Sequence, residues 1–428
     1  MMSSAVFLLQ ALVIVALPVV LLRLFQLKGI MPLVAMQVFV GIALGPSVFG
    51  RLAPEYFQIY VGKAALTPLA GLATLAVLIF GLITGLHLDH STFNNKDRMF
   101  WGVALTNVIA PMTLGCLAGL FILSRYPDEL LPGVSRAQFV AAIAICVSMK
   151  ALPVLGAILA ELELLGTRIG NVALGVAGLN DVLFWILLSI LLAAKAAGHP
   201  AEMFGLPPAL LILSAPVYLI LMVWFVRPAL ATLIASRMHD EEINTRAAVV
   251  LGGATIASAL TTELMGLHYI IGAFLIGAIL PDNLRRPIVD RLQVMTVALM
   301  MPFFFALTGM RTSLDLSSPA LMEIFALVTG VSMIGIIGGT LATSMILGRG
   351  WSFGFGLGSL LQAKGLTELI VLTILFESGF VSPRIFAAMV LMALFSTALA
   401  MPLARLALDR SVGRNEATYP LASKGQRS

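Results

Sequence analysis

Residues 170–193 read GNVALGVAGLNDVLFWILLSILLA, an apolar run that holds one charged side chain, Asp181. About 20 apolar residues are enough for a helix to cross the hydrocarbon core of a bilayer. A charge near the bilayer centre costs about 2.5–3.5 kcal/mol on insertion scales, so it usually faces the interior of a helix bundle and marks an ion or proton path. Asp181 and its neighbour Asn180 are therefore the first candidates for an ion-binding site.

The composition agrees with a membrane setting. Of the 428 residues, 60% are hydrophobic and 11% are charged, and the mean hydropathy is +1.02. Soluble domains carry about 25% charged residues. The net charge of +5 does not indicate a nucleic-acid partner, because the basic residues lie in short loops between apolar runs. The predicted fold class is an all-α polytopic membrane protein in a lipid bilayer.

Thirteen apolar runs have the length of a membrane span. They lie at residues 5–25, 30–49, 65–87, 99–123, 137–160, 167–194, 206–235, 244–264, 266–281, 290–310, 318–347, 351–377 and 382–408. With this count, seventeen Lys and Arg residues fall on one side of the membrane and seven on the other. The positive-inside rule then places the N-terminus outside and the C-terminus in the cytoplasm. The short tails and the lack of a targeting signal favour a bacterial inner membrane.

Two of the runs are interrupted near the middle. Residues 148–153 read SMKALP, in which a proline that removes a backbone hydrogen bond follows Lys150. Residues 361–368 read LQAKGLTE, with Lys364 and Glu368 on either side of a glycine. Interrupted spans at matching positions are typical of transporters that are built from inverted repeats, whose broken helices cross at the substrate site.

Motifs of enzymes and of metal sites are absent from the sequence. There is no GxxxxGK[ST] phosphate loop, so direct use of ATP is not expected. Cys116 and Cys146 lie inside apolar runs, and no His/Cys cluster has the spacing of metal ligands. We therefore expect no enzymatic activity, no bound metal and no cofactor.

Four stretches of the chain match a pattern that is known from one group of membrane proteins. They are SMKALPVLGAILAELELLGTRIGNVALGVAGLNDVLFWILL (148–188), TTELMGLHYIIGAFLIGAILP (261–281), MPFFFALTGMRTSL (301–314) and LLQAKGLTELIVLTI (360–374), the last followed by VLMALFST (390–397). In this order, they resemble the monovalent cation:proton antiporter superfamily, in the branch of the Kef-type systems and the plant cation/H+ exchangers. The resemblance runs from about residue 30 to residue 408.

The resemblance implies a Na+/H+ antiporter-like fold and a homodimer. Residues 1–410 would form the transporter domain, with a dimerisation part and a mobile core part that contains residues 137–194 and 351–408. The core would move like an elevator during transport. Residues 411–428 would be a short polar cytoplasmic tail, where Kef-type proteins have a regulatory domain.

The resemblance also implies roles for individual residues. One carboxylate, here Asp181, would bind either a cation or protons, and Asn180 beside it resembles members that are associated with electroneutral exchange. Ser148 and backbone carbonyls of the fifth span would help to coordinate the ion. Arg311 lies near the position of a basic residue on the helix that faces the core. The alternative for Asp181 is a purely structural role, as a hydrogen-bonded carboxylate that joins two helices.

One position departs from the family pattern Ser-x-Thr-Ala-x-Pro, because Lys150 stands at the threonine. Three interpretations remain open. Lys150 is an internal counter-ion that pairs with Asp181 in the unloaded state, or a group that recruits an anionic or zwitterionic substrate, or a side chain that extends along the broken helix towards water.

The other charged residues also have two interpretations each. Lys364 and Glu368 are four residues apart and are expected to neutralise each other, either as a structural pair or in contact with the ion. Arg311 is expected near Asp315 at an outer helix end. Glu263 and His268 flank a short turn and are candidate pH sensors, although a histidine in a loop is more often a surface group.

The sequence thus supports three hypotheses on function. The first is a secondary active transporter that exchanges Na+ or K+ for protons, with competition at Asp181. The second is a proton-coupled transporter of an organic anion or zwitterion that uses Lys150 and Lys364. The third is a membrane sensor that no longer transports.

Overall fold

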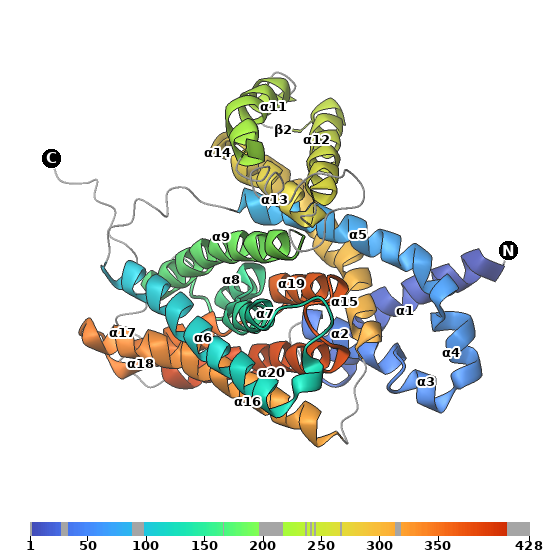
Figure 1. Cartoon of the computed structure of the whole chain (residues 1–428). Helices are drawn as coiled ribbons and strands as arrows, with labels where there is room; N and C mark the ends of the chain where they lie inside the picture. The colour runs from blue at the N-terminus through green and yellow to red at the C-terminus, as the bar shows by residue number, and fades with distance from the viewer. Residues whose placement is uncertain are drawn as a thin grey trace. The chain divides into compact units, whose positions relative to one another are not determined.

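The structure is a computed structural model of the whole chain (Figure 1). It describes residues 2–26, 33–87, 98–165, 167–196, 217–235, 238–239, 242–243, 245–265, 268–312 and 318–408. These residues are almost entirely helical. Strands in the described part are limited to β1 (Met238–His239) and β2 (Glu242–Ile243), which pair antiparallel. The all-α fold class that the sequence predicts is therefore confirmed.

Nine helices among the described residues are long and apolar enough to cross a membrane, and shorter apolar helices lie at Arg136–Ser148, Val217–Leu233, Tyr269–Ile279 and Trp351–Leu361. Each overlaps one of the apolar runs of the sequence, although Leu33–Leu52 and Leu284–Arg311 extend beyond the runs at 30–49 and 290–310. Many large apolar side chains on these helices are exposed, as lipid-facing residues are. The chain is an integral membrane protein, and the count of thirteen crossings stays a prediction. The predicted tail lies outside the described residues.

The chain divides into two compact units. Unit 1 contains residues 1–16, 49–90 and 185–309, and unit 2 contains residues 17–48, 91–184 and 310–428. Of the predicted core part, residues 137–184 and 351–408 fall in unit 2, and residues 185–194 fall in unit 1. The assignment of core and dimerisation parts stays a prediction.

Unit 1 is built around the pair of helices α5 and α13. Its elements are α3 (Phe49–Leu52), α4 (Pro54–Val61), α5 (Lys63–Leu86), η3 (Met222–Val226), α11 (Arg227–Ala235), α12 (Thr245–Leu264), α13 (Tyr269–Ile279), α14 (Asp282–Met295), η4 (Thr296–Met300) and, in part, α1 (Met2–Leu24), α9 (Arg168–Ala196) and α15 (Met301–Arg311). Gly85 on α5 and Gly277 on α13 meet backbone to backbone, so a side chain at either would overlap the partner helix. Small residues at such contacts let membrane helices approach closely.

Unit 2 contains the interrupted helices. Its elements are α2 (Leu33–Leu44), α6 (Arg98–Arg125), η2 (Pro127–Glu129), α7 (Arg136–Ser148), α8 (Leu152–Glu161), α16 (Pro319–Met333), η5 (Ile334–Gly338), α17 (Gly339–Ile346), α18 (Trp351–Leu361), α19 (Leu366–Glu377), α20 (Pro383–Leu408) and the remaining parts of α1, α9 and α15. Helix α6 packs closely on η5, where Gly335 lies against Pro111. The two breaks, between α7 and α8 and between α18 and α19, lie in this unit.

Candidate functional site

The two helix breaks meet through the main chain. Helix α7 ends at Ser148, Met149 and Ala151 are extended, and α8 begins at Leu152. The peptide N–H of Ala151 donates to the carbonyl of Ala363, at 3.0 Å, in the segment between α18 and α19. The structure thus places the two predicted breaks side by side (Figure 1). Whether they are related as inverted repeats stays a prediction.

The end of α7 exposes backbone carbonyls that have no partner inside the helix. The ammonium of Lys364 donates to the carbonyls of Cys146, Val147 and Met149 at 3.3, 3.1 and 3.0 Å. It also forms an ion pair with Glu368 Oε1 at 3.3 Å, with both side chains fully buried. The pair that the spacing predicts is therefore present, although Lys364 precedes the first turn of α19. A cation at a helix C-terminus is electrostatically favourable.

Lys150, in the break that follows α7, also bonds a carbonyl at the end of this helix. Its ammonium donates to the carbonyl of Ser148 at 3.1 Å and to the carbonyl of Asn107, on α6, at 3.0 Å. It also lies 5.8 Å from the centre of the Phe184 ring, within the range of a cation–π contact. Lys150 is 1% exposed, so its side chain does not extend to the surface of the protein. Ser148 contributes its carbonyl, while its hydroxyl donates to Ala144 O at 2.7 Å.

Asp181 lies one helical turn before Phe184 on α9. It is buried, and neither of its carboxylate oxygens has a hydrogen-bond partner among the described residues. The amide nitrogen of Asn180 is also buried and without a partner in this part of the structure. Asp181 therefore does not have the hydrogen bonds that a purely structural carboxylate joining two helices would make. A buried carboxylate without partners is a strong site for a proton or a cation.

Further polar side chains surround the breaks, and they were not predicted from the sequence. Gln362 donates to Ser332 Oγ at 3.2 Å, and Ser332 donates to the carbonyl of Val147 at 2.9 Å. Asn107 donates through its amide to Thr340 at 2.6 Å, and its Oδ1 atom lacks a partner within the described ranges. A signal for Asn107 exists in the sequence, since it is a polar residue inside an apolar run, four residues before a proline.

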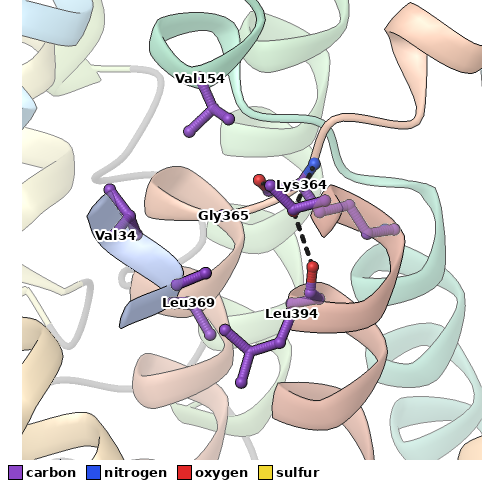
Figure 2. A pocket seen from close by; sticks show the side chains of 9 residues that line it. Val34, Val154, Lys364, Gly365, Leu369 and Leu394 are labelled. Carbon is purple, nitrogen blue, oxygen red and sulfur yellow. Dashed lines mark hydrogen bonds between the residues drawn. The ribbon is translucent and has the colours of Figure 1, made fainter. Parts of the chain in front are cut away.

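A small pocket lies beside the second break (Figure 2). Its volume of about 10 Å³ is close to the minimum that a single water molecule needs. The described residues that line it come from α2, α8, α19, α20 and the break before α19, and include Val34, Val154, Lys364, Gly365 and Leu394. The backbone of Lys364 is tied to α20 there, because Thr397 Oγ1 donates to the Lys364 carbonyl at 2.6 Å. An organic solute would not fit into this pocket.

The remaining predicted site residues lie elsewhere. Arg311, at the end of α15, forms an ion pair with Glu377 at the end of α19, a partner that the sequence did not suggest. Its expected neighbour Asp315 lies outside the described residues. Glu263 accepts a hydrogen bond from the peptide N–H of Tyr269 at 2.8 Å, and His268 precedes α13 as its N-cap. Both belong to unit 1, and their role as pH sensors stays a prediction. No group of His, Cys, Asp and Glu in the described part has the arrangement of a metal site.

The chain is similar in sequence to a family of membrane proteins and to several curated proteins. The family model described as "Sodium/hydrogen exchanger, transmembrane" matches residues 11–405. Among curated proteins, the chain is 32% identical to Cation/H(+) antiporter 17 of Arabidopsis thaliana over 376 residues, which cover 87% of this chain and 45% of that protein. It is 29% identical to the Na(+)/H(+) antiporter NhaS4 of Synechocystis over 92% of this chain and 96% of that protein.

A relative from yeast and a solved structure complete the comparison. The K(+)/H(+) antiporter 1 of Saccharomyces cerevisiae is 28% identical over 88% of this chain and 43% of that protein. The chain therefore spans less than half the length of the plant and yeast relatives. The sodium proton antiporter MjNhaP1 of Methanocaldococcus jannaschii has a similar fold, with a TM-score of 0.64 at 12% identity, over 97% of this chain and 100% of that one.

Proposed function

We propose that this chain, which belongs to the sodium/hydrogen exchanger family, exchanges a monovalent cation for protons across the membrane. Relatives named as cation/H+, K+/H+ and Na+/H+ antiporters support this activity. Since both Na+ and K+ occur in those names, the proposal covers either ion. It includes no enzymatic activity, because the cation and the proton leave the protein chemically unchanged.

The observation that carries the proposal is the state of Asp181. Its carboxylate is buried in unit 2 and neither oxygen has a hydrogen-bond partner among the described residues. A buried negative charge needs a proton or a cation close to it. Both would occupy the same oxygens, so that one excludes the other. Competition for one site is the minimal mechanism that couples proton movement to cation movement.

Lys150 is the counter-ion in this proposal. When Asp181 holds neither a cation nor a proton, the Lys150 ammonium would neutralise it, since an unpaired buried charge is costly. An arriving cation or proton would release the ammonium. Asn180, Ser148 and the carbonyls at the end of α7 would help to bind the cation.

The test measures proton flux in sealed proteoliposomes with an internal pH dye. Wild type is expected to move protons when Na+ or K+ is added, and Asp181→Asn is expected to abolish this flux. Glu161→Gln is a matched control, because Glu161 is a half-exposed carboxylate that pairs with Arg405. Retained exchange in Asp181→Asn, with normal membrane insertion, would contradict the proposal.

The proposal extends to assembly and movement. The chain would form a homodimer, and the core part with residues 137–194 and 351–408 would carry the ion by an elevator-like movement. The N-terminus would lie outside and the C-terminus in the cytoplasm of a bacterial inner membrane. Cross-linking in the membrane and labelling of single cysteines at the two ends would test these points.

A Lys150→Thr arm of the same assay separates the alternative. If Lys150 recruited an organic anion or zwitterion, wild type would not respond to alkali cations and the variant would gain this response. In the structure, both buried lysine ammonium groups of the site already donate to backbone carbonyls. This arrangement favours cation exchange.

A further inference from the structure

Pro111 gives the Lys150 ammonium one of its partners. In a helix, the carbonyl of residue 107 accepts from the N–H of residue 111. Proline has no N–H, so the carbonyl of Asn107 in the middle of α6 is left without this bond. Lys150 Nζ donates to that carbonyl at 3.0 Å.

The second partner arises from the break at the end of α7. The carbonyl of Ser148 would accept from residue 152 if the helix continued, but Met149 is already extended with ψ at 153°. Lys150 Nζ donates to it at 3.1 Å. The carbonyls of Asn107 and Ser148 therefore form a carbonyl seat for one ammonium. Two backbone interruptions, on separate helices, coincide at this seat.

The seat is fixed in place by close packing. Gly335 lies against the backbone of Pro111, so that any side chain at position 335 would overlap it. The Asn107 amide donates to Thr340 Oγ1 at 2.6 Å, which in turn donates to Ile336 O at 2.6 Å. The part of the seat on α6 is therefore held in place by η5 and α17.

The seat lies next to Asp181 but does not include it. The Lys150 ammonium lies over the ring of Phe184, one turn along α9 from Asp181, whose oxygens it does not bond. Near the breaks, Glu368 already pairs with Lys364 through its Oε1 atom. Asp181 has no such pair, because both of its carboxylate oxygens lack a hydrogen-bond partner among the described residues.

We infer that Lys150 has two positions, and that the carbonyl of Asn107, freed by Pro111, stabilises the one in which Asp181 is open to a cation or proton. In the second position, the ammonium leaves the seat and neutralises an empty Asp181. This inference rests on the proposed function. Pro111 and Asn107 are then positioning residues, which set how easily an ion displaces Lys150.

The test is Pro111→Ala, which restores the N–H that bonds the Asn107 carbonyl and changes no charge. The seat then loses strength, Lys150 stays on Asp181 for longer, and KM for the cation rises while kcat changes little. The expected rise is roughly 10-fold, the factor that corresponds to weakening one hydrogen bond to a charged group. Pro402→Ala in α20 is the matched control, as another proline inside a spanning helix.

A double-variant cycle separates this role from a structural one. In a Lys150→Met background, Pro111→Ala is expected to leave KM unchanged, because no ammonium remains to be seated. An equal rise of KM in both backgrounds would overturn the inference, and so would an unchanged KM of the single variant.

A structural measurement decides the inference without transport. In Asp181→Asn, the Lys150 ammonium is expected in the carbonyl seat, and in wild type at alkaline pH without alkali cations it is expected within hydrogen-bond distance of Asp181. The same position in both would overturn the inference. If wild type shows no cation-dependent flux, the proposed function fails, and this comparison still tests the two positions.

Discussion

Replacing Lys364 by methionine is expected to destabilise the protein by about 3–5 kcal/mol, the usual effect of removing one partner of a buried ion pair. The methionine fills a similar volume but donates no hydrogen bond. Glu368 loses its partner at 3.3 Å, and the carbonyls of Cys146 and Met149 lose the ammonium that bonds them. The carbonyl of Val147 keeps its bond from Ser332.

The double variant Lys364→Met/Glu368→Gln isolates the charge. It removes both charges and leaves the carbonyls at the end of α7 without the ammonium, so it should recover part of the loss. Each orphaned carbonyl still costs about 1–3 kcal/mol. The free energy of unfolding of the double variant should therefore lie between those of wild type and the single variant.

The measurement is the free energy of unfolding of the purified protein in mixed micelles, from denaturant titrations of wild type, the single variant and the double variant. The control is Arg405→Gln, which removes a half-exposed basic residue that pairs with Glu161 at 3.7 Å and should cost less than about 1 kcal/mol. A loss below about 1 kcal/mol for Lys364→Met, or a double variant that is less stable than the single one, would refute the reasoning.

Two further predictions concern the ends of α19. Gly365 has φ at 145°, and a Cβ there would lie 3.1 Å from Val154 Cγ2. Gly365→Ala should therefore cost about 1–3 kcal/mol of stability. A thermal shift in detergent measures this loss, and the control is Gly156→Ala, because a Cβ at Gly156 meets nothing within 4 Å. Arg311→Gln removes the half-exposed pair with Glu377 and should cost less than about 1 kcal/mol of stability. The charge swap Arg311→Glu with Glu377→Arg should restore wild-type stability. A thermal shift equal to that of Gly156→Ala, or a charge swap that destabilises further, would contradict them.

The helix breaks were predictable because their causes are local. A proline follows Lys150 at a distance of three residues, and a glycine follows Lys364 directly. The ion pair of Lys364 and Glu368 was predictable as well, since the spacing of four residues brings the side chains close even where α19 has only begun.

The partners of the two lysines were not predictable in the same way. Lys150 and Asn107 are 43 residues apart, and Lys364 reaches carbonyls more than 200 residues away. Backbone carbonyls carry no signature in the sequence, because every residue has one. Whether a carbonyl is free depends on a proline or a break elsewhere, and which side chain bonds it depends on the packing of helices. The pairing of Arg311 with Glu377 was missed for the same reason.

Four buried charged side chains, three beside the breaks and Asp181 on α9, decide how the loaded site would respond to the membrane voltage. When all four are ionised, the charges of Lys150, Lys364, Asp181 and Glu368 sum to zero. A bound Na+ or K+ and a bound proton then give the same total charge of one. Each charge that crosses the membrane changes the free energy by about 2.3 kcal/mol per 100 mV, and this contribution cancels when one loaded form moves inward and the other outward. Such an exchanger would respond to the two concentration gradients and not to the electrical potential.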